Sequence, residues 1–217
     1  MPIVRPWDRD RILAHIEPIV PLLHEVTEAA TQEARTFFDG LSLREAQERD
    51  PYLYAHLVRF HAGKLLVERG QDARVDKYWL ANSGIAFRYG WADVRLLKSA
   101  AGRLPAPGRS ITKRRFYSQY ISMPIWDQEG ERSGPLVNLV ITWDVDFRGN
   151  LSELVVYSPS EGGNTADSVH WHWRHQLEHP AMTYTPPPPV EPDEEGEDLD
   201  IERDIDEADD SDIADAQ

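Results

Sequence analysis

Histidine side chains gather in one short segment of the chain. Four of the eight histidines lie within residues 170–179, HWHWRHQLEH. Imidazole nitrogens bind divalent ions such as zinc, and histidines at i,i+4 on a helix lie close enough to share one ion. We therefore take His175 and His179, with a carboxylate from elsewhere in the chain, as candidate ligands of a divalent metal.

The local structure of residues 168–174 bears directly on this hypothesis. In a helix, His172, His175 and His179 would lie on one side, separate from the apolar stripe. In a strand, His170 and His172 would point to solvent, and the metal interpretation weakens. The sequence alone leaves both alternatives open.

Two aspartates offer the missing carboxylate. Asp144 and Asp146 stand at i,i+2 in a segment with strand periodicity, so they share one face at a separation of about 6.6 Å. Such a pair suits metal binding or acid–base catalysis. The simpler interpretation is that both residues belong to a turn, where aspartate is common.

Basic residues are concentrated between residues 88 and 115. The segment carries eight cations against one acid, Asp93, and therefore a formal charge of +7. Such density is typical of a surface that binds phosphate or an acidic protein, although a solvated face gives the same pattern. The candidate partner-binding residues are Arg88, Arg95, Lys98, Arg103, Arg109, Lys113, Arg114 and Arg115.

The opposite charge is concentrated at the C-terminus. Residues 186–217 begin with four prolines and contain 15 acidic residues and one basic residue, a formal charge of −14 out of −15 for the chain. We expect a Pro spacer followed by a disordered acidic tail, because too few apolar residues are present to form a core. The tail could compete for the partner of the basic segment, recruit another protein, or only increase solubility.

Several functional classes have no support in the sequence. The chain contains no cysteine, which excludes a disulfide scaffold and a thiolate nucleophile. No phosphate-binding glycine loop or hydrolase nucleophile elbow occurs. No apolar run approaches the length of about 18 residues needed for a membrane helix, so we expect a cytoplasmic protein that does not bind membranes.

Apolar spacing predicts an α+β fold in which a helical N-terminal part packs on an antiparallel sheet. Residues 1–70 show helical periodicity, with a break at Pro18 and Pro21 before a second helix from about Leu22, a capping box that starts at Ser42, and a last helix from Pro51 to Gly70.

The sheet, of about five to six strands, is expected within residues 75–160. Its strands include 94–97, 111–121 and the long hairpin of 136–147 with 151–157, in which alternation places Trp143 and Phe147 in the core. Residues 168–179 close the fold, and residues 1–185 are expected to form a single domain.

Because no catalytic motif stands out, we expect a non-enzymatic regulatory or interaction protein. Its basic segment would bind an anionic partner, either nucleic acid or an acidic protein. The alternative is a small metal-dependent enzyme that uses His175 and His179 with Asp144 or Asp146.

Overall fold

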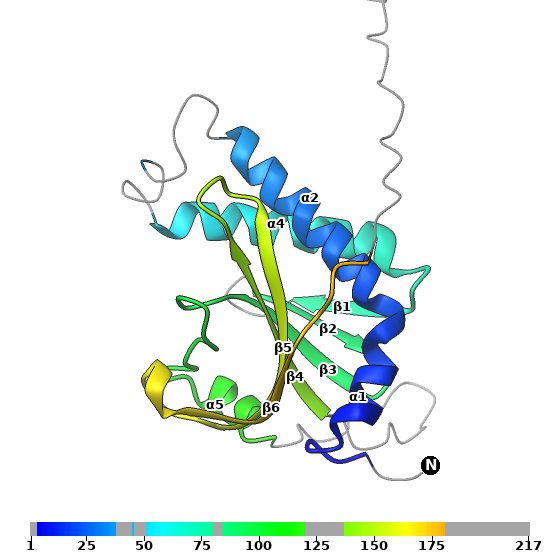
Figure 1. Ribbon diagram of the computed structural model, residues 1–217, viewed down its shortest axis with the longest axis vertical. Coiled ribbons are helices and arrows are strands. Elements are labelled where there is room, and N and C mark those ends of the chain that lie inside the picture. The colour runs from blue at the N-terminus through cyan, green and yellow to red at the C-terminus, as the bar shows by residue number, and fades with distance from the viewer. Residues whose placement is uncertain (1–3, 38–44, 46–50, 80–83, 120–136, 181–217) are drawn as a thin grey trace, which may run out of the picture. The chain divides into compact units, whose positions relative to one another are not determined.

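The computed structural model describes residues 4–37, 45, 51–79, 84–119 and 137–180, all within one compact unit (Figure 1). The predicted capping box at Ser42 and the acidic tail of residues 186–217 fall outside the described residues, so both stay predictions. None of the helices in the described ranges is long and apolar enough to cross a membrane.

The N-terminal helices show the predicted interruption. Helix α1 (Arg9–Ile16) leads into a single 3-10 turn, η1 (Glu17–Ile19), and then into α2 (Val20–Phe37). Pro18 lies in the turn, where its missing N–H interrupts α-helical hydrogen bonding. The next described helix, α4 (Pro51–Gly70), has the bounds that the sequence predicted.

Six strands form one sheet, within the predicted number of about five to six, and their spatial order follows the chain. They are β1 (Val75–Trp79), β2 (Ile85–Tyr89), β3 (Ala92–Lys98), β4 (Val137–Val145), β5 (Leu151–Gly162) and β6 (Val169–Gln176). All neighbours pair antiparallel except β3 and β4, which run parallel. The predicted long hairpin is confirmed as β4 and β5.

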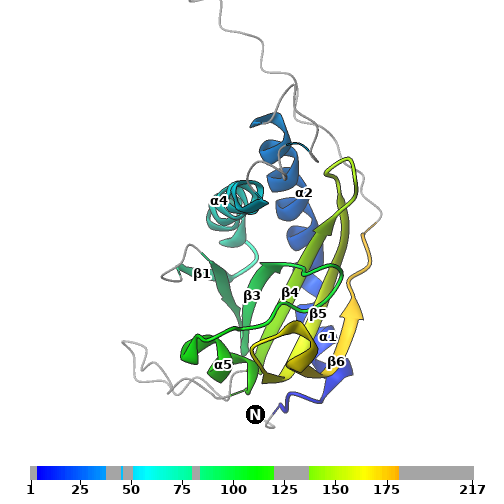
Figure 2. The ribbon, with the colours of Figure 1, turned by 90° about the vertical axis from the view of Figure 1, so that its left-hand side faces the viewer.

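The parallel pair requires a long connection. Two parallel strands cannot be joined by a tight turn, so residues 99–136 carry the chain from the end of β3 back to the start of β4. The described part of this connection includes a short helix, α5 (Ile111–Tyr117). Figure 2 shows α5 beside the lower parts of β3 and β4, apart from α2 and α4.

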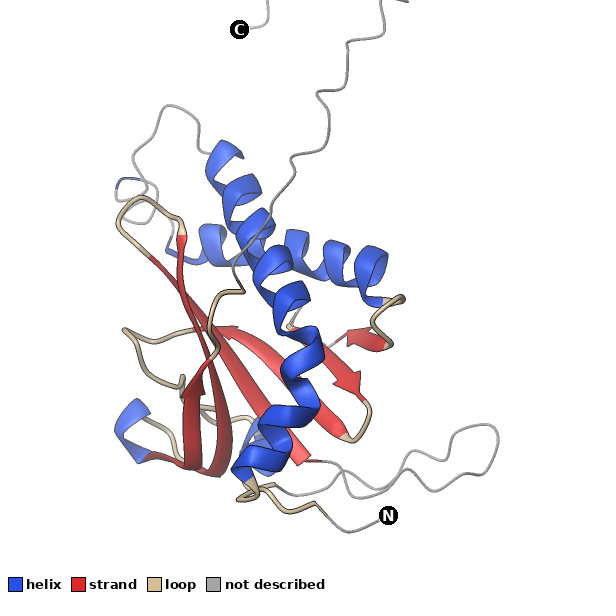
Figure 3. Cartoon of the chain, turned by 45° about the vertical axis from the view of Figure 1, so that its right-hand side comes forward, coloured by secondary structure: helices blue, strands red, loops and turns tan. Residues whose placement is uncertain are grey.

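Apolar side chains form two separate clusters. The larger one joins the helices to the sheet. Figure 3 shows the helices crossing one side of the sheet. Its buried members include Leu23, Val26, Tyr54, Val58, Val94, Leu96, Leu139, Ile141 and Trp143. The smaller cluster consists of Leu104, Phe116, Tyr117, Val140, Val155, Tyr157 and Val169. The central strand β4 contributes to both clusters, so it is buried on its two faces.

Two local predictions are corrected. Residues 111–117 form helix α5 instead of the predicted strand, and the Ser110 hydroxyl accepts a hydrogen bond from the Lys113 backbone N–H at the start of that helix. Phe147 lies beyond the end of β4 and is 84% exposed, so it is not a core residue.

The structure also decides between the two alternatives for residues 168–174. Residues 169–176 form strand β6, paired with β5, and η2 (Ala166–Ser168) precedes it. His170 and His172 are exposed and Trp173 is buried, as the strand alternative predicted, but Trp171, which that alternative also placed in the core, is 39% exposed.

Candidate anion-binding pocket

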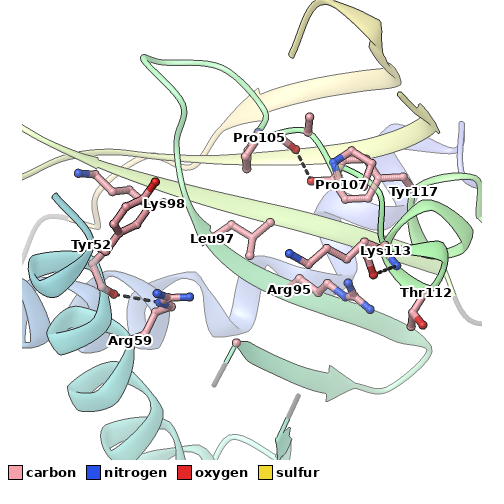
Figure 4. A pocket seen from close by; sticks show the side chains of 14 residues that line it. Tyr52, Arg59, Arg95, Leu97, Lys98, Pro105, Pro107, Thr112, Lys113 and Tyr117 are labelled. Atoms are coloured by element: carbon pink, nitrogen blue, oxygen red, sulfur yellow. Dashed lines mark hydrogen bonds between the residues drawn. The ribbon is translucent and has the colours of Figure 1, made fainter. Parts of the chain in front are cut away.

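A cavity of about 480 Å³ lies between α4, β3 and the connection that follows β3 (Figure 4). In Figure 4 Tyr52 and Arg59 extend from α4, Arg95 and Leu97 from β3, and Thr112 and Lys113 from α5. The lining residues are Tyr52, Ala55, Arg59, Gly84, Arg95, Leu97, Lys98, Pro105, Ala106, Pro107, Ser110, Thr112, Lys113 and Tyr117. The volume falls within the range of small-molecule sites.

The charge of the lining is entirely positive. No carboxylate belongs to the described lining. Four of the lining side chains are cations, namely Arg59, Arg95, Lys98 and Lys113. Prolines, alanines and Leu97 supply apolar surface between them. A lining of this kind fits an anionic group that is attached to an apolar group.

Arg95 is the most buried of these cations. Strand alternation turns Val94 and Leu96 toward the larger core, and Arg95 and Leu97 toward the cavity side. Arg95 is only 6% exposed, and its guanidinium carbon lies 4.1 Å from the centroid of the Phe116 ring.

The polar contacts of Arg95 are incomplete. Its Nε atom is buried and has no hydrogen-bond partner among the described residues, and burial lowers the pKa of the guanidinium. A guanidinium that is desolvated in this way gains strongly from an anion that supplies the missing acceptor.

The charge of Asp93 partly stabilises the charged form of Arg95, but Asp93 is not part of the cavity lining. Asp93, on the same strand, accepts a hydrogen bond from the Tyr78 hydroxyl, and burial raises the pKa of its carboxyl. Its cross-strand neighbour is Arg88, whose Nε is also buried without a described partner. None of the ion pairs formed between described residues includes Arg88 or Arg95.

The other three cations reach the cavity from separate elements. The Lys98 ammonium lies 5.8 Å from the centroid of the Tyr54 ring and 5.9 Å from that of Trp143. Arg59 donates from Nε to the Ala55 carbonyl oxygen at 3.0 Å, which fixes its direction, and burial lowers its pKa. Lys113 lies in the first turn of α5.

The wall formed by residues 105–107 is held on the sheet. The Tyr117 hydroxyl donates to the Pro105 carbonyl oxygen at 2.7 Å, and burial raises the pKa of this tyrosine. Gly162 on β5 permits the close packing, because a Cβ atom there would lie 2.5 Å from Pro107 Cγ and 2.9 Å from Tyr117 Cβ. The wall is therefore preorganised.

The structure divides the eight predicted partner-binding residues. Arg95, Lys98 and Lys113 line the cavity. Arg103 forms an ion pair with Asp167 at 2.8 Å. Arg114 donates to the Gly108 carbonyl oxygen and to the Asn164 side chain. Arg88 lies on β2, and Arg109 and Arg115 are exposed outside the cavity lining.

Sequence reasoning missed Arg59. It lies on α4, nearly 30 residues before the basic segment, and nothing in its own neighbourhood marks it as more than an exposed helix residue. Only the packing of α4 across the end of β3 brings it to the other cations.

The predicted metal ligands do not come together. His175 Nδ1 accepts a hydrogen bond from Arg9 Nη2 at 3.1 Å. Asp144 accepts from the Ser99 hydroxyl at 2.6 Å, and Asp146 accepts the backbone N–H groups of the turn after β4. Because residues 169–176 are a strand, the helical i,i+4 spacing does not apply. Among the described residues, His179 clusters instead with two side chains of α2.

Comparisons with models of protein families, with curated proteins and with solved structures give no match to this chain. The geometry of the described residues is therefore what supports a function.

Proposed function

We propose that this chain is a non-enzymatic regulatory or interaction protein that binds an anionic partner in the pocket between α4, β3 and α5. The group that enters is a carboxylate or a phosphate attached to an apolar group. Arg59, Arg95, Lys98 and Lys113 would bind the anion, and Leu97 with the proline wall would contact the apolar part.

One observation carries this proposal. Arg95 is nine-tenths buried, lacks a described hydrogen-bond partner for its Nε, and opens on a cavity whose four charged lining residues are all cations. A solvated basic surface would leave its arginines exposed to water, and burying a charge that its surroundings compensate only in part destabilises a protein. An anionic ligand accounts for both the burial and the shared sign.

The size of the cavity favours a small group over a nucleic-acid duplex. About 480 Å³ accommodates a small organic acid, or one or two side chains of an acidic protein segment. Arg109 and Arg115 are exposed arginines of the basic segment outside the cavity, and a polyanion bound along the surface would contact such residues instead.

Calorimetric titration with four probes, and with inorganic phosphate as a reference, tests the proposal on the full chain. Octanoate and octyl phosphate represent small organic anions, a short peptide of alternating Asp and Leu represents an acidic protein, and a single-stranded oligonucleotide represents a polyanion. We expect an apolar anion or the peptide to bind more tightly than inorganic phosphate, and the strongest probe to identify the source of the anion.

A matched pair of variants locates the binding. Arg95→Met should lower the affinity by about 10-fold to 100-fold, the loss expected for one charge-assisted hydrogen bond in a buried site. Arg109→Met removes the same charge from the exposed surface and should leave the affinity unchanged. Equal losses in both variants, or binding of the oligonucleotide alone, would contradict the pocket and favour a surface site for nucleic acid.

The same titration tests the predicted role of the acidic tail. A chain ending at Tyr184 lacks the 15 carboxylates of residues 186–217. If the tail competes with the anionic partner, the truncated chain binds the strongest probe more tightly, and the difference shrinks as salt is added. Equal affinities at low salt would reject competition.

A further inference from the structure

A second cluster of functional side chains lies outside the anion pocket, where α2 meets the segment that follows β6. His24 and Glu28 stand one turn apart on α2, and His179 comes three residues after the end of β6. One candidate ligand atom of each residue lies within 4.8 Å of the other two. None of the three residues lines the anion pocket.

The His24 ring is buried with one nitrogen unused. The side chain is only 4% exposed, and its Nε2 lies 3.1 Å from the Leu177 carbonyl oxygen. A carbonyl oxygen can only accept, so Nε2 carries the hydrogen and Nδ1 presents a lone pair. Nδ1 is buried and has no hydrogen-bond partner among the described residues. Buried polar atoms without a partner are uncommon, and a lone pair of this kind is suited to a metal.

A backbone carbonyl oxygen orients the His179 ring, as it does the His24 ring. Its Nδ1 lies 2.5 Å from the Pro180 carbonyl oxygen, so Nδ1 is the donor and Nε2 faces the Glu28 carboxylate at 2.7 Å. This separation is that of a hydrogen bond between the imidazole and the carboxylate. A zinc ion bound to both atoms at its ordinary bond lengths would hold them about 3.3 Å apart, so this contact would lengthen by about 0.6 Å on metal binding.

We propose that His24, Glu28 and His179 form a binding site for a divalent transition-metal ion of the zinc type. The ligands would be His24 Nδ1, a Glu28 carboxylate oxygen and His179 Nε2, a set that suits zinc in a protein without cysteine. The Leu177 and Pro180 carbonyls would hold the two rings, as backbone acceptors do around metal-bound histidines.

The surroundings also favour a cation with an open coordination position. The ring centroids of His24 and His179 are 4.8 Å apart at an interplanar angle of 61°, so the rings are not stacked against each other. A cavity of about 140 Å³ adjoins the cluster, with the acidic residues Glu153 and Glu178 in its lining. It leaves room for a water molecule or a small ligand on the ion.

The bound ion would connect distant parts of the chain. Residues 24 and 28 belong to the second helix, and residue 179 follows the last strand. A metal bridge between them would fix the segment after β6 on α2, in addition to the hydrogen bond from His24 to Leu177.

Zinc titration of the full chain, after removal of metal with EDTA, tests the site. Excess Mg²⁺ is kept present so that the acidic residues of 186–217, which bind hard cations through oxygen, do not contribute to the zinc signal. We expect one zinc ion per chain, a rise in the melting temperature on its addition, and visible absorption bands of low-symmetry coordination with Co²⁺ in its place.

Two variants at exposed or half-exposed ligands avoid disturbing the core. Glu28→Gln and His179→Gln should each lower zinc affinity by at least about 100-fold and remove the Co²⁺ bands, because each deletes a direct ligand. The matched control His170→Gln changes an exposed histidine of β6 and should bind as the unmodified chain does. His24→Gln then tests the buried ligand.

Circular dichroism of each variant in EDTA separates loss of a ligand from loss of folding. A folded Glu28→Gln chain that binds zinc as tightly as the unmodified chain would overturn the proposal. So would no zinc binding by the unmodified chain, or an equal loss in His170→Gln.

Discussion

The two sides of strand β3 show how one segment serves two purposes. Val94 and Leu96 are fully buried in the core that also includes side chains of α2 and α4. Arg95 and Leu97 face the other way, where α5 and residues 105–107 cover the sheet incompletely and leave a cavity. Alternation along the strand therefore separates residues that stabilise the fold from residues available to a ligand.

The two faces of the sheet differ in the residues that lie on them. On the helix side, residues such as Trp143 and Phe87 are fully buried. On the cavity side, the remaining space is lined by cations and small apolar residues. Substitutions on the first side should change stability, whereas those on the second side should change binding.

The sharpest test uses two adjacent leucines. Leu96→Ala removes a fully buried side chain and should lower the free energy of unfolding by about 2–5 kcal/mol. Leu97→Ala removes the same atoms from the cavity side and should lower the free energy of unfolding by less than about 2 kcal/mol. It should also weaken the binding of an apolar anion. Urea denaturation of both variants measures the difference, and similar losses of stability would contradict the different roles of the two faces of β3.

The wall of the cavity gives a smaller effect. Tyr117→Phe deletes the hydroxyl that donates to the Pro105 carbonyl, so we expect a loss of about 0.5–1.5 kcal/mol in the free energy of unfolding. Because the same bond positions residues 105–107, affinity for the anion should fall as well. An unchanged affinity beside a reduced stability would show that the wall does not depend on this bond.

Replacing Arg95 should have little effect on stability. Arg95→Met keeps an unbranched side chain over Phe116 and removes a buried charge, so the free energy of unfolding should change by no more than about 1 kcal/mol or should increase. Thermal unfolding measures it. A large loss of stability would mean that Arg95 stabilises the fold instead of serving mainly to bind a ligand.

The smallest effects concern two aspartates with opposite pH dependence. Burial raises the pKa of Asp93, so the folded chain retains that proton to higher pH, and the free energy of unfolding falls as pH rises from the ordinary to the raised pKa. The pKa of the exposed Asp146 is lowered, first by the Asn150 backbone N–H, so its contribution is lost as pH falls below the ordinary value.

Asp93→Asn and Asp146→Asn separate these two contributions. Urea midpoints measured between about pH 3 and about pH 7 should lose the descending component in the first variant and the ascending component in the second. Identical pH profiles in both variants would contradict the assignment of either aspartate.

The sequence was informative where periodicity dominates. The break at Pro18, the long helix from Pro51 and the hairpin of β4 with β5 each follow from one local rule about proline or alternation. Residues 111–117 have the aromatic and β-branched composition of a strand, yet the Ser110 cap and their place in the connection after β3 give a helix. Local propensity is weak where a long connection must pack on a sheet.

The candidate sites were less predictable, because tertiary packing assembles them. Three of the pocket cations lie in the predicted basic segment, but Arg59 comes from α4. The spacing of His24 and Glu28 at i,i+4 was a signal that could have been read from the sequence. Their partner His179 was recognised as a ligand type, but its position beside α2 depends on the path of the chain after β6.

The parallel pairing of β3 and β4 has a consequence for the order of folding. Residues 99–136 must span this pairing, and they carry the proline wall and α5, so the pocket cannot form from local contacts alone. Closing such a loop costs conformational entropy before the contacts that stabilise it have formed, and this slows folding. An anion that binds the finished pocket would therefore act on unfolding far more than on refolding, and would lengthen the lifetime of the native state.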